Sequence, residues 1–185
     1  MKNLPPGAKL VFKGVIYEVW EWPQLLYNGA TSQFQCLRRP NTAEVIATVG
    51  DKVIMLNQEQ PHWKAPKLSI VGGRCDENES PLEAIRRELL EETGYTSNDI
   101  KLWREYEPSE KMVWVVYLFV ARNCWKVSEQ YLDPGEKIET IMVSFDEFLD
   151  IASRQEFYET ELRADCVRAK YDPVFKEQFS KILFG

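Results

Sequence analysis

The chain has 185 residues, of which 44% are hydrophobic and 28% charged, and it carries a net charge of −6. This composition is typical of one packed domain with a small extension, and it excludes a disordered chain. A protein this acidic repels a phosphate backbone, so non-specific nucleic-acid binding is not expected. An anionic substrate would need a metal ion or a local basic patch.

Cysteine and histidine usage argues against a structural zinc site. Cys36, Cys75, Cys124 and Cys166 are scattered without a CxxC pair, and His62, which we expect in a loop, is the only histidine. We predict reduced, mostly buried thiols and a cytoplasmic protein. No apolar run approaches the about 20 residues that span a bilayer, and the N-terminus lacks the apolar region of a signal peptide. A membrane is therefore not an expected partner.

The first 42 residues show strand and turn signals. Residues 10–22 are rich in β-branched and aromatic side chains and predict two strands with a turn near Lys13. Asn28-Gly29 predicts the next turn, and residues 32–40 predict a third strand that ends before Pro40. Residues 1–42 are thus expected to form an antiparallel β extension.

Residues 43–185 are expected to form the main, mixed α/β domain. Its strands are predicted at residues 44–49, 52–57, 67–73, 100–106, 113–121 and 138–144. The run 113–121 is almost continuously apolar, which predicts burial on both faces. Helices are predicted over residues 145–154 and 164–184, and Asp172-Pro173 should interrupt the second.

The best-defined element is a helix from Pro81 to Thr93. Ser80 and Glu83 form a Ser-x-x-Glu capping box, and Pro81 suits the first helical position. Gly94 stands where a left-handed residue ends a helix. An apolar stripe at helical spacing predicts the face that is buried, namely Leu82, Ile85 and Leu89.

Three acids crowd the last two turns of this helix: Glu88, Glu91 and Glu92. Like charges at this spacing repel by about 0.2–0.5 kcal/mol per pair, and acids at a helix C-terminus oppose the dipole. The cluster becomes favourable if it holds a hard divalent cation, which prefers oxygen ligands. The alternative is a solvated face with Glu83–Arg87 and Arg87–Glu91 ion pairs.

The spacing around the helix matches a known signature. Gly73 is followed, after five residues, by Glu79 and, after seven more, by Arg87-Glu88-Leu89, Glu91-Glu92 and Gly94-Tyr95. This pattern resembles the Nudix box of the Nudix hydrolases at every charged and glycine position, and Tyr95 replaces the usual bulky aliphatic residue. The resemblance implies an α+β fold, the Nudix α/β/α sandwich with a mixed β-sheet, preceded here by the β extension.

The resemblance also implies a metal-dependent reaction. Its metal would be Mg²⁺, with Mn²⁺ as a substitute, and the implied ligands are Glu88, Glu91, Glu92 and the carbonyl of Gly72, supported by Glu79. Arg87 would orient the glutamates, and Glu91 is assigned a catalytic role beside it. Water would attack one phosphorus of a nucleoside diphosphate linked to a second group, and a carboxylate would serve as general base.

The flanking sequence, over residues 10–150, resembles the ADP-ribose and nucleoside diphosphate sugar pyrophosphatase branch. Pro108 lies near the place of a marker proline of that branch. The products would be a nucleoside monophosphate and a sugar phosphate. The acidic loop after the 113–121 strand would supply the general base, and its candidates are Glu129, Asp133, Glu136 and Glu139. Glu136 is preferred because it directly precedes the next strand.

Substrate contacts are implied by the same branch. Phe34 and Arg39 occupy the places of a base-stacking aromatic residue and a basic contact, often across the interface of a homodimer. Core packing for Phe34 and an ordinary surface charge for Arg39 are the alternatives. Glu59 and Gln60 replace an aromatic residue and an arginine of the branch; Gln60 and Gly73 complete the predicted substrate contacts.

Two other functions stay open at this level. One is a nucleoside triphosphate or dinucleoside polyphosphate hydrolase of the same family, and the other is a non-catalytic sensor of nucleotide sugars. The intact box favours an enzyme, because a sensor would tolerate loss of Glu88 or Glu92.

Overall fold

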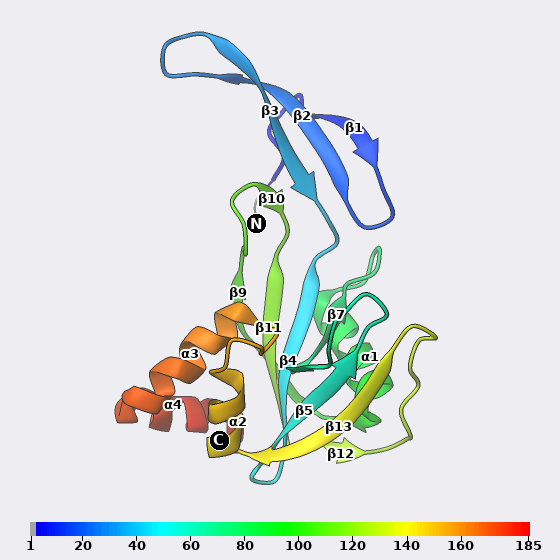
Figure 1. Ribbon diagram of the computed structural model, residues 1–185, viewed down its shortest axis with the longest axis vertical. Coiled ribbons are helices and arrows are strands. Elements are labelled where there is room, and N and C mark those ends of the chain that lie inside the picture. Colours follow the sequence, from blue (N-terminus) through cyan, green and yellow to red (C-terminus); the bar gives the residue numbers. More distant parts are fainter. Residues whose placement is uncertain (1–2) are drawn as a thin grey trace.

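A mixed β-sheet of seven strands forms the centre of the main domain (Figure 1). The computed structural model describes residues 3–185. The strands are β4 (Thr42–Val49), β5 (Lys52–Glu59), β6 (Lys67–Ser69), β7 (Val71–Arg74), β9 (Asp99–Tyr106), β11 (Val116–Arg122) and β13 (Lys137–Ser144). The main path runs β13-β5-β4-β11-β9, and β6 and β7 pair with β5 and β4. The central strands β4 and β11 are parallel and almost wholly buried, as their apolar sequences predict.

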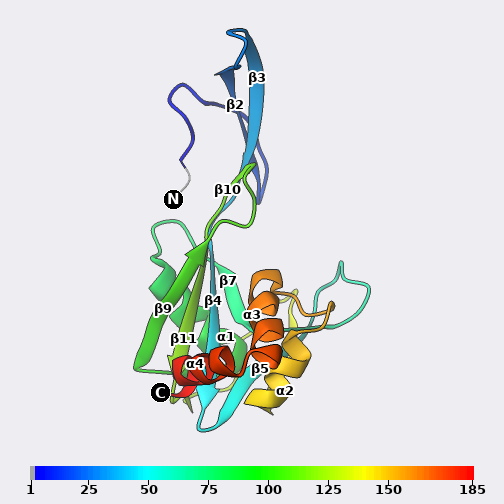
Figure 2. The same cartoon turned by 90° about the vertical axis from the view of Figure 1, so that its left-hand side faces the viewer.

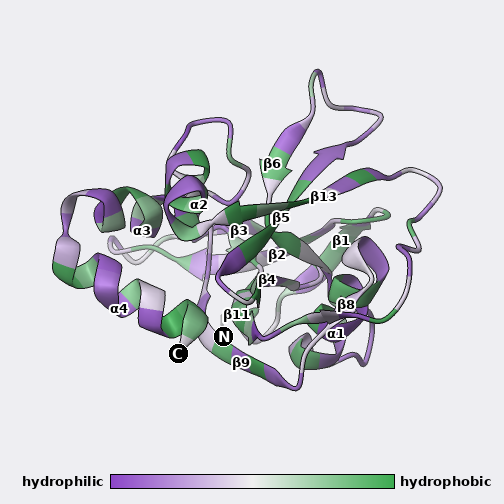
Figure 3. Ribbon diagram, turned by 90° about the horizontal axis from the view of Figure 1, so that it is seen from below, coloured by the Kyte–Doolittle hydropathy of each residue, from purple (hydrophilic) through white to green (hydrophobic). Residues whose placement is uncertain are grey.

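Helices cover both faces of this sheet, as the view from below shows (Figure 3). The helices are α1 (Pro81–Thr93), α2 (Phe145–Ala152), α3 (Thr160–Tyr171) and α4 (Pro173–Phe184). Ile85 and Leu89 of α1 pack in one core cluster, while Phe148 and Phe179 lie in a second cluster beneath α2, α3 and α4. The predicted α/β/α sandwich is therefore confirmed.

The N-terminal segment forms a separate four-stranded sheet, called here the extension, that projects from one end of the domain (Figures 1 and 2). It contains β1 (Lys9–Lys13), β2 (Glu18–Leu25), β3 (Thr31–Arg38) and β10 (Met112–Val113). Strand β2 continues past the predicted end at residue 22 and includes Pro23. Because β1 pairs with β2 only as far as Glu21, the missing N–H of Pro23 faces no strand on that side.

Two predicted strands are each divided in the structure, so both predictions were wrong in this respect. Trp114 and Val115 separate β10, which joins the extension, from β11 in the main sheet. Ile70 separates β6 from β7, which pair with β5 and β4 respectively. At both breaks the chain changes the strand with which it pairs. The identity of that strand depends on distant parts of the chain, so the local sequence does not indicate the break.

The loop after β11 is fixed to the end of α1. Its strand β12 (Trp125–Lys126) pairs with β8 (Tyr95–Thr96) in a small sheet that the sequence did not predict. The N–H groups of Val127 and Ser128 donate to the carbonyl of Gly94, and that of Tyr131 donates to the carbonyl of Glu91. These bonds satisfy carbonyls that a helix end leaves unpaired. They also hold the loop against the acidic end of α1.

The C-terminal helical region differs from the prediction only at its start. Helix α3 begins at Thr160 rather than at residue 164, and the predicted interruption at Asp172-Pro173 is confirmed. Asp172 Oδ1 accepts a 3.0 Å hydrogen bond from the Phe175 N–H and so caps α4. All four cysteines are free and buried. No helix within residues 3–185 is long and apolar enough to cross a membrane.

Candidate active site

Helix α1 carries the acidic cluster, and local sequence fixes both of its ends. Ser80 accepts from the Glu83 N–H while the Glu83 carboxylate accepts from the Ser80 N–H at 2.9 Å, the predicted capping box. Gly94 ends the helix with φ of 74°. A side chain at Gly94 would also collide with the carbonyl of Ser128, which belongs to the loop that returns to the helix. Glycine is therefore required there for both conformation and space.

Arg87 donates five hydrogen bonds, and four of them organise the acids. Its guanidinium donates twice to Glu79, at 2.9 and 3.0 Å, in a bidentate pair. It also donates to Glu88 Oε1 at 2.8 Å and to Glu91 Oε2 at 3.1 Å. A further bond reaches the carbonyl of Arg74 at 3.1 Å. A planar guanidinium suits this arrangement, because it offers several donors in fixed directions. Its bonds leave one oxygen of Glu88 and one of Glu91 unused by Arg87.

Glu88 and Glu92 face the glycine pair of β7. The Glu88 carboxylate lies against Gly73 so closely that a Cβ at this glycine would collide with it. Glu92 Oε2 accepts a 3.1 Å hydrogen bond from the Gly72 N–H, and the residue is only 5% exposed. One turn of α1 thus places two carboxylates on the same short stretch of backbone.

This crowding perturbs both carboxyls. Burial is the largest cause that raises the pKa of Glu88, and it raises the pKa of Glu92 well above the usual range. The charge of Glu88 raises the pKa of Glu92 further, and Glu136 raises both, while Arg87 opposes the shift at Glu88. Such a cluster is stabilised when a cation neutralises it.

Of the four candidate acids, Glu136 contributes a charge that raises the pKa of both Glu88 and Glu92. It lies just before β13, where its carboxylate accepts from the Asp133 N–H at 3.2 Å and its own N–H donates to the Asp133 carbonyl. Glu129 instead forms an exposed ion pair with Lys126, and Glu139 accepts from Asn57. Glu136 therefore lies within electrostatic range of the box acids.

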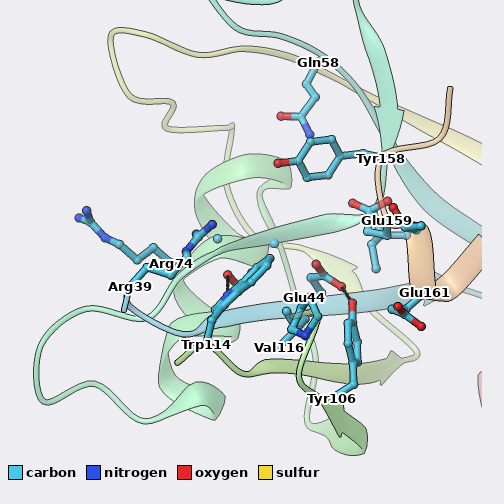
Figure 4. Close-up of a pocket in the computed structure, with 16 residues that line it drawn as sticks. Arg39, Glu44, Gln58, Arg74, Tyr106, Trp114, Val116, Tyr158, Glu159 and Glu161 are labelled. Carbon is cyan, nitrogen blue, oxygen red and sulfur yellow. Dashed lines mark hydrogen bonds between the residues drawn. The ribbon is translucent and has the colours of Figure 1, made fainter. Parts of the chain in front are cut away.

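A pocket of about 480 Å³ opens beside Gly72 and Gly73 (Figure 4). Its walls come from β4, β9, the segment after β10 and the start of α3. The residues that shape it most are Arg39, Glu44, Tyr106, Trp114, Tyr158 and Glu159. Arg39 stacks over the Trp114 ring at 4.5 Å, and the Tyr106 hydroxyl donates to Glu44 Oε2 at 3.2 Å.

The predicted substrate residues are divided between this pocket and the rest of the molecule. Arg39 and Gly73 line the pocket. Phe34 lies on β3 of the extension, where its ring packs on Trp22 with centroids 5.0 Å apart. Gln60 lies just beyond β5 and outside the lining, which instead includes Gln58.

Five of the six residues that shape the pocket most were not predicted as site residues. Tyr106, Trp114 and Tyr158 had no distinguishing signal, because aromatic residues are common in any core. Glu159 also had none, since it reaches the pocket only through the path of the chain between α2 and α3. Glu44 alone had a signal, as the single acid in the buried run of β4.

The residues beside α1 fit a hard divalent cation, although residues 3–185 contain no ready-made group of three or more Asp, Glu, His or Cys side chains that could hold a metal ion. The fit rests on Glu92, a buried carboxyl with a raised pKa next to Glu88 and to the backbone of Gly72. Mg²⁺ ordinarily takes one or two carboxylates and completes its shell with waters and substrate phosphates.

Comparison with known proteins shows the family to which the chain belongs. The NUDIX domain model matches residues 38–163. The ADP-ribose pyrophosphatase of Bacillus subtilis (strain 168) is 26% identical over 152 residues, which cover 80% of this chain and 82% of that protein. The methanol dehydrogenase activator of Bacillus methanolicus is 26% identical over 153 residues, 81% of this chain and 83% of that protein.

Two further matches are more limited, the first in coverage and the second in sequence identity. The RNA pyrophosphohydrolase of Aliivibrio fischeri (strain MJ11) is 32% identical over 82 residues, which cover 40% of this chain and 45% of that protein. A crystal structure of an ADP compounds hydrolase covers 91% of this chain and 95% of its own, with a TM-score of 0.72 and 21% identity. That likeness confirms the fold. The family match covers more than half of the chain and confirms the resemblance, and the chain belongs to the Nudix hydrolase family.

Proposed function

We propose that this protein hydrolyses the pyrophosphate bond of ADP-ribose or another nucleoside diphosphate sugar in the presence of Mg²⁺ or Mn²⁺. The products are a nucleoside monophosphate and a sugar phosphate. The observation that carries the proposal is that Glu88 and Glu92 lie against Gly72 and Gly73, next to a pocket large enough for part of a nucleotide sugar. The similarity to the Bacillus subtilis ADP-ribose pyrophosphatase supports the choice of substrate class.

In this proposal the chain's own groups have separate tasks. Glu88, Glu91, Glu92 and the Gly72 carbonyl hold the metal. A bound metal neutralises the diphosphate and the charge that develops during attack. Arg87 and Glu79 keep the glutamates in position, and Gly73 lets the substrate and Glu88 approach the same backbone.

Glu136 is the proposed general base. It accepts a proton from the attacking water, whose oxygen forms a bond to one phosphorus while the bridging phosphorus–oxygen bond breaks. Its charge already acts on Glu88 and Glu92, which supports a place at the reacting centre. The oxygen released from the bridge stays with the second phosphate.

We also propose a homodimer in which the extension of one copy packs against the other copy. The extension exposes large apolar side chains, among them Leu10, Phe12, Leu25 and Phe34, with exposures of 43%, 60%, 68% and 38%. Apolar groups gathered on a projecting sheet are typical of an interface. Phe34 and Arg39 are then proposed to contact the nucleotide near that interface.

A substrate panel tests the reaction. ADP-ribose, UDP-glucose, ATP and diadenosine tetraphosphate are incubated with Mg²⁺, Mn²⁺ or EDTA, and the products are separated chromatographically. We expect AMP and ribose 5-phosphate from ADP-ribose, and no turnover in EDTA. Preferred cleavage of ATP or of the dinucleotide would replace this proposal with the triphosphate or dinucleoside polyphosphate function. Binding of ADP-ribose without turnover in either metal would indicate the sensor.

Variants of the box test the metal assignment. Glu88→Gln and Glu92→Gln are expected to lower kcat at least about 100-fold, because charge stabilisation at the reacting phosphate is lost. Glu77→Gln is the matched control, since Glu77 is an exposed acid in the loop before α1. Full turnover of both box variants in Mg²⁺ would refute the assignment.

A further inference from the structure

The pocket beside α1 contains a buried carboxyl oxygen that no protein group satisfies. Glu159 directly precedes α3, yet its side chain does not cap this helix. The residue is 6% exposed, and its Oε2 has no hydrogen-bond partner among the described residues. Glu159 lines the pocket, and Figure 4 shows it on the side of Tyr158 and Glu161.

Such a group is costly unless a ligand uses it. A buried polar atom without a partner destabilises a fold, because it has lost its hydrogen bonds to water. Burial raises the pKa of Glu159 well above the usual range, and Glu44 raises it further. A protonated carboxyl both donates and accepts hydrogen bonds, and so does a hydroxyl group. A ligand hydroxyl therefore matches the chemistry of this wall.

The charges of the pocket are divided between its two ends. Arg39 and Arg74 lie together at one end (Figure 4), and Arg74 directly follows the glycine pair Gly72-Gly73. Glu44, Glu159 and Glu161 lie at the other end, with the Tyr106 hydroxyl bonded to Glu44. A diphosphate suits the basic end. The end with the carboxyl groups has, within residues 3–185, no basic side chain in its lining to bind a further phosphate, and its carboxyl and phenol groups suit an uncharged group with several hydroxyls.

We propose that Glu159 is a specificity-determining residue whose free carboxyl oxygen hydrogen-bonds a hydroxyl of the sugar attached to the diphosphate. This inference rests on the proposed function and deepens it, because it identifies the residue that distinguishes a sugar from a third phosphate. It also gives a role to the start of α3, which lies far from the box in the sequence.

The test compares two substrates and three variants in Mg²⁺. ADP-ribose carries the sugar, whereas an ADP ester with methyl in place of the sugar keeps the diphosphate and lacks its hydroxyls. Glu159→Met removes the polar atoms at similar size, Glu159→Gln restores a donor and an acceptor, and Glu156→Met is the control at an exposed acid nearby. The readouts are kcat and KM for each substrate and the melting temperature of each protein.

We expect Glu159→Met to lower kcat/KM for ADP-ribose about tenfold, mainly through KM, and to leave the methyl ester unaffected. Glu159→Gln should recover most of the loss, and Glu156→Met should behave as wild type. The Met variant should melt no lower than wild type, because it removes an unsatisfied buried group. If Glu159→Met does not fold, Glu159→Gln provides the test. Its kcat/KM for ADP-ribose divided by its kcat/KM for the methyl ester should be lower than the same ratio in wild type.

Two results would overturn the inference. One is an equal loss for both substrates, which would make Glu159 a structural residue, and the other is no loss for ADP-ribose in Glu159→Met. Failure of the proposed function is distinguishable, because the wild-type protein would then hydrolyse neither substrate in Mg²⁺.

Discussion

The carboxylate of Glu88 occupies the space where a side chain at Gly73 would lie. Gly73→Ala should therefore displace Glu88 while leaving the fold intact, because only the end of a side chain has to move. We expect kcat to fall by about 100-fold, since small misplacements of catalytic groups have effects of that size. Steady-state kinetics with ADP-ribose, together with a thermal melt, measures both parts of this prediction.

Gly135→Ala is the control for Gly73→Ala. A Cβ at Gly135 meets no atom within 4 Å, and this glycine is not among those with positive φ. It also lies next to Glu136, so an unchanged rate would show that small loop substitutions alone do not impair turnover. Wild-type kcat in Gly73→Ala would contradict the close approach of Glu88.

Arg87→Lys should keep the positive charge and lose the arrangement of acids. A lysine cannot form the bidentate pair with Glu79 and still reach Glu88 and Glu91. Groups that orient metal ligands typically affect metal affinity or activity by about 10- to 100-fold. When the rate of Arg87→Lys is measured over a series of Mg²⁺ concentrations, we expect the metal affinity or the maximal rate to fall by a factor in this range. Arg86→Lys is the neighbouring control, because Arg86 donates only to the Ser97 carbonyl; a similar loss there would argue against a special role for Arg87.

Glu136→Gln should reduce turnover without weakening metal binding. General bases contribute about 10²- to 10⁴-fold, so kcat should fall by that order while the Mg²⁺ concentration for half-maximal rate stays constant. Glu129→Gln and Glu139→Gln are measured beside it, because these acids have other partners in the structure. A larger loss in either of them would transfer the role of base to that residue.

Glu44 predicts a pH dependence of stability. Burial raises its pKa from the ordinary 4.5 to about 7, against the opposing effects of Tyr106 and Arg104. Between these values the folded state retains a proton that the unfolded chain has lost, so stability decreases as the pH rises through this window. The difference corresponds to as much as about 3 kcal/mol.

Glu44→Gln should remove this contribution. Urea unfolding in EDTA between pH 4.5 and 8 is expected to give a flatter profile than wild type, with the variant relatively more stable at the alkaline end. The hydrogen bond from Tyr106 can persist to the amide oxygen. Glu105→Gln, an exposed acid on β9, should retain the wild-type slope. Identical slopes in all three proteins would place the titration elsewhere.

Leu10→Asp should dissociate the proposed dimer. Leu10 pairs with Trp20 on β2 and is 43% exposed on the projecting sheet. Lys9→Asp is the control, because side chains alternate along a strand and Lys9 points to the opposite face. Analytical ultracentrifugation should give a dimer for wild type and Lys9→Asp and a monomer for Leu10→Asp. A monomeric wild type would refute the dimer.

The structural features that the sequence predicted correctly are those set by residues close together in the chain. The ends of α1 follow from Ser80, Glu83 and Gly94, and Arg87 with Glu91 is an i, i+4 pair. The buried parallel strand β11 followed from its apolar run. These features depend on residues within one or two turns of each other, so no knowledge of the remaining chain was needed.

The pocket could not be predicted in the same way. Glu44 and Glu159 line the same pocket although they are far apart in the sequence, and their proximity depends on the path from α2 to α3. The break at Trp114 was missed because an apolar run does not reveal that its two parts pair with different sheets. Tertiary pairing decides both cases.

Trp114 connects the extension to the pocket. Strand β10 pairs with β3, and the next residue, Trp114, donates to Thr42 at 3.0 Å while its ring lies under Arg39. If the extension rotated as a rigid body, it would move the Trp114 ring, which forms part of the pocket wall. The width of the pocket would then change. A second copy bound to the extension and a substrate bound in the pocket would then change each other's affinity by the same factor. The extension would thus couple dimer formation to substrate binding.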